Sequence, residues 1–198
     1  MIEIKKLVKE INGKPFLKVN HFIFENKIYQ LQGENASGKS LLANILAGVD
    51  HRISGQVIHN PSKHRILFLS HEGIGFPFLS IEENIRLAAK LIKSELSDDY
   101  SELFSNPDHL QVPYSESSLG TKQKVGLALL YAEVPYSLVI IDESFISVDK
   151  RAKQLIENRL LIMKESCIIL ISHENFSSYF QEQINILNIN DFKEDIIV

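Results

Sequence analysis

A glycine-rich segment at residues 33–40 has the residue types and spacing that bind phosphate. It reads Gly-Glu-Asn-Ala-Ser-Gly-Lys-Ser and lies between a predicted strand at 28–32 and a predicted helix at 41–46. Glycines let the backbone approach an anion closely, and the amides of the loop and of the helix N-terminus can bind it. Lys39 supplies a positive charge for the β- and γ-phosphates, and the Ser40 hydroxyl can bind Mg²⁺. The order of strand, loop and helix favours this site over an ordinary turn.

Two adjacent carboxylates, Asp142 and Glu143, follow the apolar run 138–141. In open α/β sheets, ligands bind beyond the carboxyl ends of the strands, which is where a strand at 138–141 would place these acids. Paired carboxylates are costly to bury without a cation or water. Asp142 is therefore a candidate Mg²⁺ ligand, and Glu143 is a candidate to orient or deprotonate a water. A strand that leaves the core through polar residues is the alternative.

His173 follows another apolar run, 167–171. A lone histidine after a strand is most often a loop residue. If the strands are parallel, however, His173 lies at the same edge of the sheet as Lys39 and Asp142. That position predicts a contact between the imidazole and the γ-phosphate.

The elements that must hold these residues alternate between strands and helices. Near-continuous apolar runs predict strands that are buried on both faces, as in a parallel sheet covered by helices. These runs are 66–69, 138–141 and 167–171. The first 32 residues alternate loosely, and Asn12-Gly13 among them is a hairpin signal, which predicts an antiparallel unit. The sequence therefore indicates an α/β fold.

Residues 78–133 differ from the rest because they contain no long strand candidate. Ser80 and Glu83 form a capping box, and the apolar residues that follow keep helical spacing. We therefore expect a single domain over 1–198, with a mostly helical subdomain inserted at about 78–133.

Composition excludes several classes of protein. Hydrophobic residues make up 44% and charged residues 23% of the 198 residues, which is typical of a globular chain. The formal net charge of −4 gives no basic footprint for nucleic acid. The one cysteine, Cys167, allows no intrachain disulfide. No apolar run approaches the ~20 residues of a spanning helix, and the N-terminus lacks a signal-peptide core, so any work at a membrane requires a partner chain.

With these motifs in this order, the chain resembles the nucleotide-binding subunit of an ATP-binding cassette (ABC) transporter of a compact bacterial type. The implied fold is that of a P-loop NTPase, with a mostly parallel sheet core, an N-terminal antiparallel β subdomain and a helical insertion. Residues 33–40 match the Walker A motif, and 138–143 match Walker B with the catalytic glutamate. The D-loop falls at 147–149, and His173 matches the switch histidine. The implied nucleotide-binding residues are Gly33, Glu34, Asn35, Ala36, Ser37, Gly38, Lys39, Ser40 and Leu41.

The signature motif of the family, usually Leu-Ser-Gly-Gly-Gln, matches Ser-Ser-Leu-Gly-Thr at residues 117–121. Ser118 and Gly120 are retained, whereas Leu119 and Thr121 replace a glycine and the glutamine. A serine and a glycine at a helix start direct a hydroxyl and amides toward an anion, although a plain helix cap is the alternative.

Two further positions depart from the family pattern. His71 stands where a glutamine usually follows the strand at 66–69, and its imidazole makes it a further candidate Mg²⁺ contact. That contact requires a neutral imidazole, which predicts a loss of activity as the pH falls toward the pKa of His71. Ile11 stands where an aromatic residue often stacks on adenine, so we expect weaker adenine selectivity. GTP should therefore be tested beside ATP.

The resemblance also implies a mechanism with ATP and Mg²⁺ as cofactors. Ser40 and Asp142 would hold Mg²⁺, Glu143 would polarise the attacking water, and His173 would contact the γ-phosphate. Two cassettes, identical or paired, would dimerise head to tail. Ser118 and Gly120 of one cassette would complete the site of the other, and Asp149 belongs to the D-loop.

A separate integral membrane permease is the further partner that the resemblance implies, with no nucleic acid involved. Its docking is expected around 71–79, where Phe76, Pro77 and Phe78 have no obvious helical face; the alternative is that these three residues pack inside the insertion. The chain would then be cytoplasmic and peripheral on the inner face of the cell membrane. Its small size favours export.

Three alternatives stay open at the level of sequence. The first is a soluble ABC-type ATPase that is not tied to transport. The second is a small P-loop kinase, which should carry an arginine-rich lid, whereas 78–133 contains only Arg86. The third is a degenerate cassette that binds ATP and regulates a partner, against which Glu143 and His173 argue.

Overall fold

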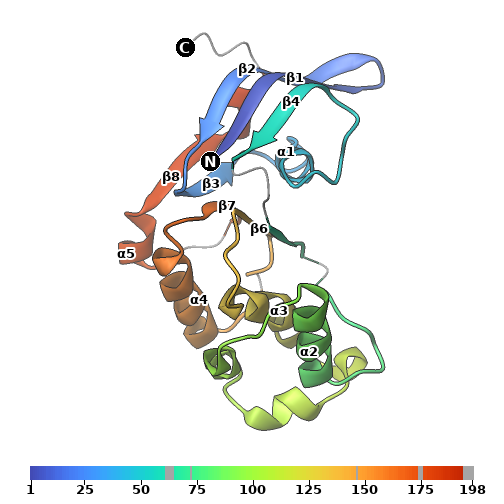
Figure 1. Cartoon of the computed structure of the whole chain (residues 1–198), viewed down its shortest axis with the longest axis vertical. Coiled ribbons are helices and arrows are strands. Elements are labelled where there is room, and N and C mark those ends of the chain that lie inside the picture. Colours follow the sequence, from blue (N-terminus) through green and yellow to red (C-terminus); the bar gives the residue numbers. More distant parts are fainter. Residues whose placement is uncertain (61–64, 72, 146, 174–175, 194–198) are drawn as a thin grey trace.

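The computed structural model describes residues 1–60, 65–71, 73–145, 147–173 and 176–193, and it begins with an antiparallel sheet of three strands (Figure 1). These strands are β1 (Ile2–Ile11), β2 (Lys14–Phe24) and β4 (Ser54–His59), in the order β2-β1-β4. Asn12 and Gly13 join β1 to β2 with φ values of 53° and 72°, the left-handed backbone of a two-residue hairpin turn. The predicted antiparallel N-terminal unit is therefore confirmed.

The second sheet has five strands, and every neighbouring pair in it is parallel. Its strands are β3 (Ile28–Gln32), β5 (Ile66–Leu69), β6 (Leu138–Asp142), β7 (Cys167–Ile171) and β8 (Ile184–Asn188). The order is β5-β6-β7-β3-β8. All residues of β6 and β7 are buried, as their continuous apolar runs predict.

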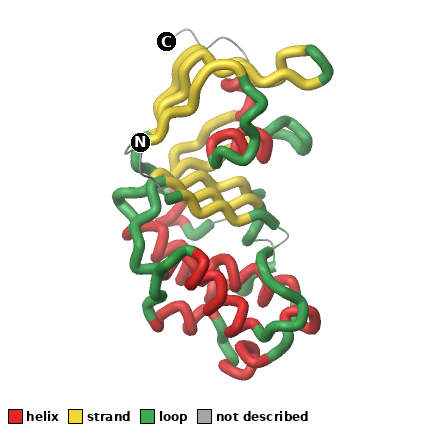
Figure 2. The backbone as a smooth tube through the Cα atoms, turned by 45° about the vertical axis from the view of Figure 1, so that its right-hand side comes forward, coloured by secondary structure: helices red, strands yellow, loops and turns green. Residues whose placement is uncertain are grey.

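Alternate residues of the parallel strands enter two separate hydrophobic cores. Ile140 and Ile169 pack with the antiparallel sheet and with α1 (Lys39–Leu46). Val139 and Ile168 pack on the opposite face, against the helices. These helices are α2 (Ile81–Leu91), α3 (Leu119–Ala128), α4 (Lys150–Ile162) and α5 (Ser178–Gln181). Figures 1 and 2 show the resulting layers, with the parallel sheet between the antiparallel sheet and most of the helices.

Residues 78–133 are mostly helical, as predicted. Ser80 and Glu83 form the expected capping box of α2, with the Glu83 amide donating to Ser80 Oγ at 3.1 Å and the Ser80 amide donating to Glu83 Oε2 at 2.8 Å. Three short 3₁₀ turns connect α2 to α3, and a fourth follows α3. They are η1 (Asp98–Leu103), η2 (Pro107–Gln111), η3 (Tyr114–Glu116) and η4 (Leu129–Tyr131). Within the described part of the chain, no helix is long and apolar enough to cross a lipid bilayer.

The sequence did not predict two of the strands, β4 and β8. Each lies at the edge of its sheet, with one neighbour only. An edge strand is partly solvated, so it does not need the continuous apolar run that revealed β6 and β7. β8 leads into a further 3₁₀ turn, η5 (Ile189–Phe192), whose Ile189 and Phe192 are buried beside the phosphate loop and the antiparallel sheet.

Candidate nucleotide-binding site

Four parallel strands end at one edge of the sheet, and each is followed by residues that the sequence singled out. β3 leads into the phosphate loop, and β6 ends at Asp142. His71 comes two residues after β5, and His173 two residues after β7. Because Asp142 pairs in register with Ile171 of β7, the ends of β6 and β7 are level. The parallel topology therefore gathers the predicted residues at one edge, as expected.

The phosphate loop, residues 33–38, has a backbone that few residue types adopt. Gly33 and Gly38 have φ values of 149° and 108°. A Cβ on Gly38 would lie 2.6 Å from the Phe16 ring, so both the backbone angle and the space require glycine. Gly38 is the N-cap of α1 and offers no side-chain cap. The first amides of this helix therefore depend on another acceptor, such as a bound anion.

Two polar side chains of the loop region have hydrogen-bond donors available for ligand oxygens. The buried Lys39 ammonium donates to the carbonyls of Gly33 and Glu34, both at 2.9 Å. These bonds use two of its three donors and hold it across the loop. Ser37 Oγ is buried and has no hydrogen-bond partner among the described residues. A buried hydroxyl left unpaired costs free energy, which a phosphate oxygen would recover.

Asp142 is a buried carboxylate with a hydroxyl beside it. Burial raises its pKa above the ordinary value, and the charge of Glu143 adds to the rise. A hydrogen bond with Ser40 and the positive charges of His71 and Lys39 act in the opposite direction. These effects place Ser40, Lys39 and His71 near the carboxylate.

The Ser40 and Asp142 pair fits a Mg²⁺ ion that also binds phosphate. No group of three or more His, Cys, Asp and Glu side chains suited to a metal occurs among the described residues. Mg²⁺ commonly takes only one or two carboxylates from the protein and completes its shell with phosphates and water. A hydroxyl and a carboxylate beside a phosphate loop are such a donor set.

Glu143 has an unusual backbone conformation. Its φ is 54°, a left-handed value that costs free energy for a residue with a side chain. The Glu143 amide donates to the Ile171 carbonyl at 2.8 Å, and the next hydroxyl, Ser144 Oγ, donates to the Ser70 carbonyl at 2.9 Å. The turn is thus fixed from β7 on one side and from the segment before His71 on the other. This turn directs Glu143 into the cleft of the phosphate loop.

Both candidate histidines are exposed to solvent. His173 lines a cavity of about 600 Å³ together with Gly33 and Gln30. Gln30 is buried and donates to the carbonyl of Ser172 at 3.0 Å, which fixes the backbone just before His173. His173 therefore lies beside the start of the phosphate loop, and His71 lies beside Asp142.

The cleft over the phosphate loop has a volume of about 540 Å³. It is lined by Ile11, Phe16, Glu143 and the segment 35–41. Ile11 and Leu41 also line a neighbouring cavity of about 610 Å³, so the two cavities are adjacent. Phe16 was missed at the level of sequence, where the only signal is an aromatic residue shortly after the hairpin.

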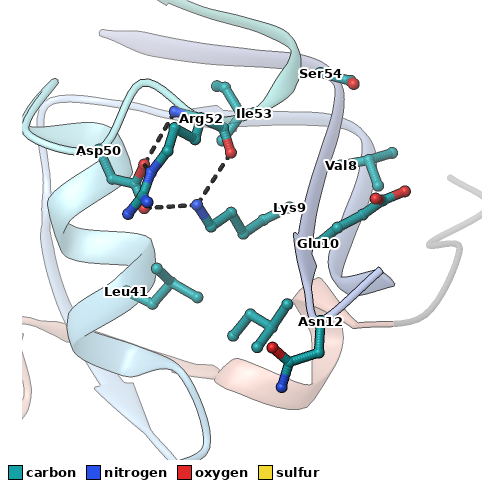
Figure 3. Close-up of a pocket in the computed structure, with 10 residues that line it drawn as sticks. Val8, Lys9, Glu10, Asn12, Leu41, Asp50, Arg52, Ile53 and Ser54 are labelled. Carbon is teal, nitrogen blue, oxygen red and sulfur yellow. Dashed lines mark hydrogen bonds and ion pairs between the residues drawn. The ribbon is translucent and has the colours of Figure 1, made fainter. Parts of the chain in front are cut away.

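The neighbouring cavity contains an ion-paired group that the sequence did not reveal (Figure 3). Lys9 Nζ donates to Asp50 at 2.7 Å and to the Arg52 carbonyl at 3.0 Å. The hydrogen bond from Lys9 lowers the pKa of Asp50 to about 2, and the amide of Arg52 contributes. The Arg52 side chain is 89% exposed at the rim. These residues come from β1 and from the loop between α1 and β4, so no local motif could have indicated them.

The predicted signature residues lie apart from this cleft and line neither cavity. Ser118 is the N-cap of α3, and its Oγ accepts a hydrogen bond from the Thr121 amide at 3.2 Å. Gly120 is buried in the first turn of α3. Asp149 caps α4 in the same manner, accepting from the Ala152 amide at 3.0 Å.

The parallel sheet, the glycine-rich loop before α1 and the acids at the end of β6 together define a P-loop nucleoside triphosphatase. Residues 16–146 match the model of the ABC transporter family, and the chain belongs to this family as an ATP-binding ATPase subunit. The expected fold class and the expected family are therefore confirmed, and the small kinase is excluded.

Relatives within the family differ in what their names say they transport. The chain is 30% identical to an uncharacterized ABC transporter ATP-binding protein of Haemophilus influenzae, over 88% of this chain and 76% of the relative. It is 28% identical to the cytochrome c biogenesis ATP-binding export protein CcmA of Colwellia psychrerythraea, over 86% and 83%. It is also 28% identical to the Fe(3+) ions import ATP-binding protein FbpC 2 of Pectobacterium atrosepticum, over 88% of this chain but 56% of the relative.

Solved structures share the fold over nearly the whole chain. The structure of an ATP-binding subunit of an ABC transporter superposes with a TM-score of 0.76 at 22% identity, covering 95% of this chain and 86% of that chain. The ATP-binding cassette MJ0796, solved as a dimer in a post-hydrolysis state with ADP and Pi, gives a TM-score of 0.75 at 19% identity, covering 100% and 97%.

Proposed function

We propose that this ATPase subunit binds Mg-ATP in the cleft over the phosphate loop and hydrolyses it with Glu143 and His173. The observation that best supports this proposal is that Lys39, Asp142 and Glu143 come together at the end of the parallel sheet. Phosphoryl transfer is catalysed mainly by positioning and by neutralising charge, which is what such an arrangement supplies. The loop amides, Ser37 Oγ and the Lys39 ammonium bind the phosphates in this proposal.

Ser40 and Asp142 hold Mg²⁺, and His71, whose charge acts on Asp142, contacts the ion or its water in this proposal. When bound, the ion neutralises charge on the phosphate oxygens. It would also offset the cost of burying Asp142, because a cation stabilises the ionised carboxylate.

Glu143 accepts a hydrogen bond from the attacking water and orients it toward the γ-phosphate. Its left-handed backbone and the hydrogen bonds around it keep the carboxylate aimed into the cleft, which lowers the cost of positioning. His173 approaches the γ-phosphate from the end of β7 and donates a hydrogen bond to it.

The base extends past Ile11 and Leu41 toward the cavity of Lys9, Asp50 and Arg52. Ile11 gives apolar contact without stacking, and Phe16 is an aromatic residue that lines the cleft beside Gly38. The exposed Arg52 guanidinium can donate to a purine edge, and adenine and guanine both offer acceptors there. We therefore expect GTP to bind beside ATP.

Two cassettes pair head to tail, as a homodimer or with a paired cassette. The support is that Ser118 and Gly120 line no part of the cleft of their own chain, although Ser118 begins a helix in a manner suited to an anion. A structural neighbour of this fold is itself a dimeric cassette. Paired in this way, each signature turn would close the nucleotide site of the other cassette.

The pair acts on an integral membrane permease and lies on the cytoplasmic, inner face of the membrane. Phe76 and Phe78 are 49% and 78% exposed, with ring centroids 6.0 Å apart, and form an apolar patch suited to such a partner. The alternative, that Phe76, Pro77 and Phe78 pack inside the insertion, is wrong because all three are exposed. Glu72, in the same segment 71–79, lies outside the described residues.

Two predictions stay open within the family. Export and import subunits are both among the relatives, so the preference for export stays a prediction. The division into one domain with the 78–133 subdomain inserted is also our proposal, supported by the two cores that share the central sheet. Transport by the purified chain reconstituted with its permease would separate this function from that of an ABC-type ATPase without transport.

The residue roles are tested by Glu143→Gln, with Glu165→Gln on the exposed surface as the control. We expect kcat for ATP to fall by ~10²–10⁴-fold, the usual contribution of a general base, with ATP affinity nearly unchanged. EDTA should abolish turnover of the wild type. Turnover by Glu143→Gln at the wild-type rate would overturn the role of Glu143.

A further inference from the structure

The start of α3 is attached to the segment 147–149 of the same chain by three contacts. This segment, which we call the D-loop, lies between β6 and α4 in the sequence. Its contacts with α3 involve backbone, amide and charged groups. They join Gly120 to Ser147, Gln123 to Ser147 and Lys124 to Asp149.

The first contact requires a glycine in the signature turn. A Cβ on Gly120 would lie 2.1 Å from the Ser147 carbonyl oxygen, which is backbone and cannot rotate away. Close approach to its own D-loop is therefore sufficient reason for glycine at position 120, whatever else Gly120 does.

The second and third contacts use buried polar groups. Gln123 is 2% exposed, and its Oε1 accepts a hydrogen bond from the Ser147 amide at 3.3 Å. Lys124 is 6% exposed, and its ammonium donates to Asp149 Oδ2. A charge so buried is costly without a partner, so this ion pair holds α3 and the D-loop at a fixed separation.

Asp149 extends the connection to α4. Its second oxygen accepts from the Ala152 amide at 3.0 Å and caps that helix. Burial alone would raise the pKa of Asp149, but the hydrogen bonds from Lys124 and Ala152 outweigh it and hold the pKa below its ordinary value. One carboxylate thus joins the middle of α3 to the first turn of α4.

We propose that Lys124 is a positioning residue that holds the signature turn, with Ser118, in place for the nucleotide of the partner cassette. This inference rests on the proposed head-to-tail pairing. Lys124 acts through the D-loop and contacts no nucleotide. Its loss therefore impairs the opposite site in the dimer and leaves the phosphate loop of its own chain intact.

The first experiment measures ATP-dependent pairing in a Glu143→Gln background, where hydrolysis does not reverse it. Adding Lys124→Met should raise the dimer dissociation constant by about tenfold or more, because the signature turns of both chains are displaced. Binding of a fluorescent ATP analogue to the monomer should change less than about twofold. Lys124→Arg, which keeps the charge, should restore most of the pairing. Lys122→Met, on the same helix but directed to the Ser115 carbonyl, is the matched control.

The second experiment asks in which site Lys124 acts. Glu143→Gln/Lys124→Met is mixed with Glu143→Gln/Lys39→Met. Each variant alone lacks a complete site in its homodimer. In the mixed dimer, the intact phosphate loop of the first chain faces the intact signature turn of the second. At a protein concentration where neither variant dimerises alone, we therefore expect ATP-dependent dimers in the mixture.

The outcomes separate this inference from the proposed function. Equal pairing of Glu143→Gln with and without Lys124→Met would overturn the inference while the pairing stands. Absence of complementation, or loss of monomer ATP binding in Lys124→Met and Lys124→Arg alike, would also overturn it. If the Glu143→Gln variant does not dimerise in the presence of ATP, the proposed head-to-tail pairing is wrong, and the inference that rests on it is wrong as well.

Discussion

The edge of the parallel sheet and the first turn of α3 both carry residues suited to phosphate, but they differ in completeness. At the sheet edge, Lys39, Asp142 and Glu143 converge on one cleft. At α3, Ser118 caps its own helix and lines no cavity beside the phosphate loop. In the proposed pairing, this turn would bind the nucleotide of a second chain, which explains why it faces no cleft of its own.

The two regions also differ in how they are held. The sheet edge is fixed by main-chain pairing in a buried sheet, whereas the signature turn depends on side chains that reach the D-loop. Substitutions at the edge should therefore change nucleotide binding and chemistry, and substitutions around α3 should change stability and pairing.

The largest effect is expected at the edge of the parallel sheet, where Lys39→Met should weaken the binding of ATP. Loss of the ammonium removes the only charged group that lies across the phosphate loop among the described residues. We expect ATP affinity to fall by ~100-fold or more, equivalent to about 3 kcal/mol. Titration calorimetry checks this, with the exposed Lys27→Met as control. An affinity within a few-fold of wild type would show that the amides bind the phosphates without Lys39.

Around α3, Gly120→Ala should mainly cost stability. The added Cβ meets the Ser147 carbonyl oxygen at 2.1 Å, and overpacking of this kind costs about 1–3 kcal/mol. Denaturant unfolding measures the loss. Gly126→Ala in the same helix is the matched control, because the nearest atom to its Cβ would be the end of the Leu69 side chain at 3.0 Å, and alanine favours a helix. Equal effects of the two substitutions would contradict the close approach of α3 to the D-loop.

Asp142 and Asp149 should respond to pH in opposite directions. Burial raises the pKa of Asp142, so in the absence of cation its ionisation destabilises the fold as the pH rises through the raised pKa. Asp142→Asn should therefore stabilise the nucleotide-free chain near pH 7 by about 1 kcal/mol, and the gain should vanish below the ordinary pKa of 3.8.

The pKa of Asp149 is lowered, so its contribution is present above the ordinary value of 3.8 and is lost as the pH falls through the lowered pKa. Asp149→Asn should destabilise the chain at pH 7 and have little effect in strong acid. Unfolding midpoints of both variants across this range are the measurement. A stabilising Asp149→Asn at neutral pH would remove the contrast between the two regions.

The smallest effect is expected for Arg52→Ala in the cavity beyond Ile11. The side chain is 89% exposed, so its hydrogen bond to a base is screened by water. We expect the affinities for ATP and for GTP each to fall by about two- to threefold, measured by competition with a fluorescent nucleotide. No change in either affinity would place the base elsewhere.

Local sequence signals predicted much of this architecture, whereas contacts between residues far apart in the sequence could not be predicted. The phosphate loop, the capping box of α2 and the strands β6 and β7 each follow from contiguous residues, because their periodicity or spacing is itself the physical cause. Edge strands β4 and β8 lack that signal because solvent covers part of them. The ion pair of Lys124 with Asp149 and that of Lys9 with Asp50 join residues 25 and 41 positions apart, which only the folded chain brings together.

The central claim, that the cleft is completed only by a second cassette, is tested most directly by native mass spectrometry of Glu143→Gln with Mg-ATP. We expect a dimer that carries two ATP molecules, which disappears without nucleotide or when ADP replaces ATP. A monomer that holds ATP at every protein concentration would contradict it.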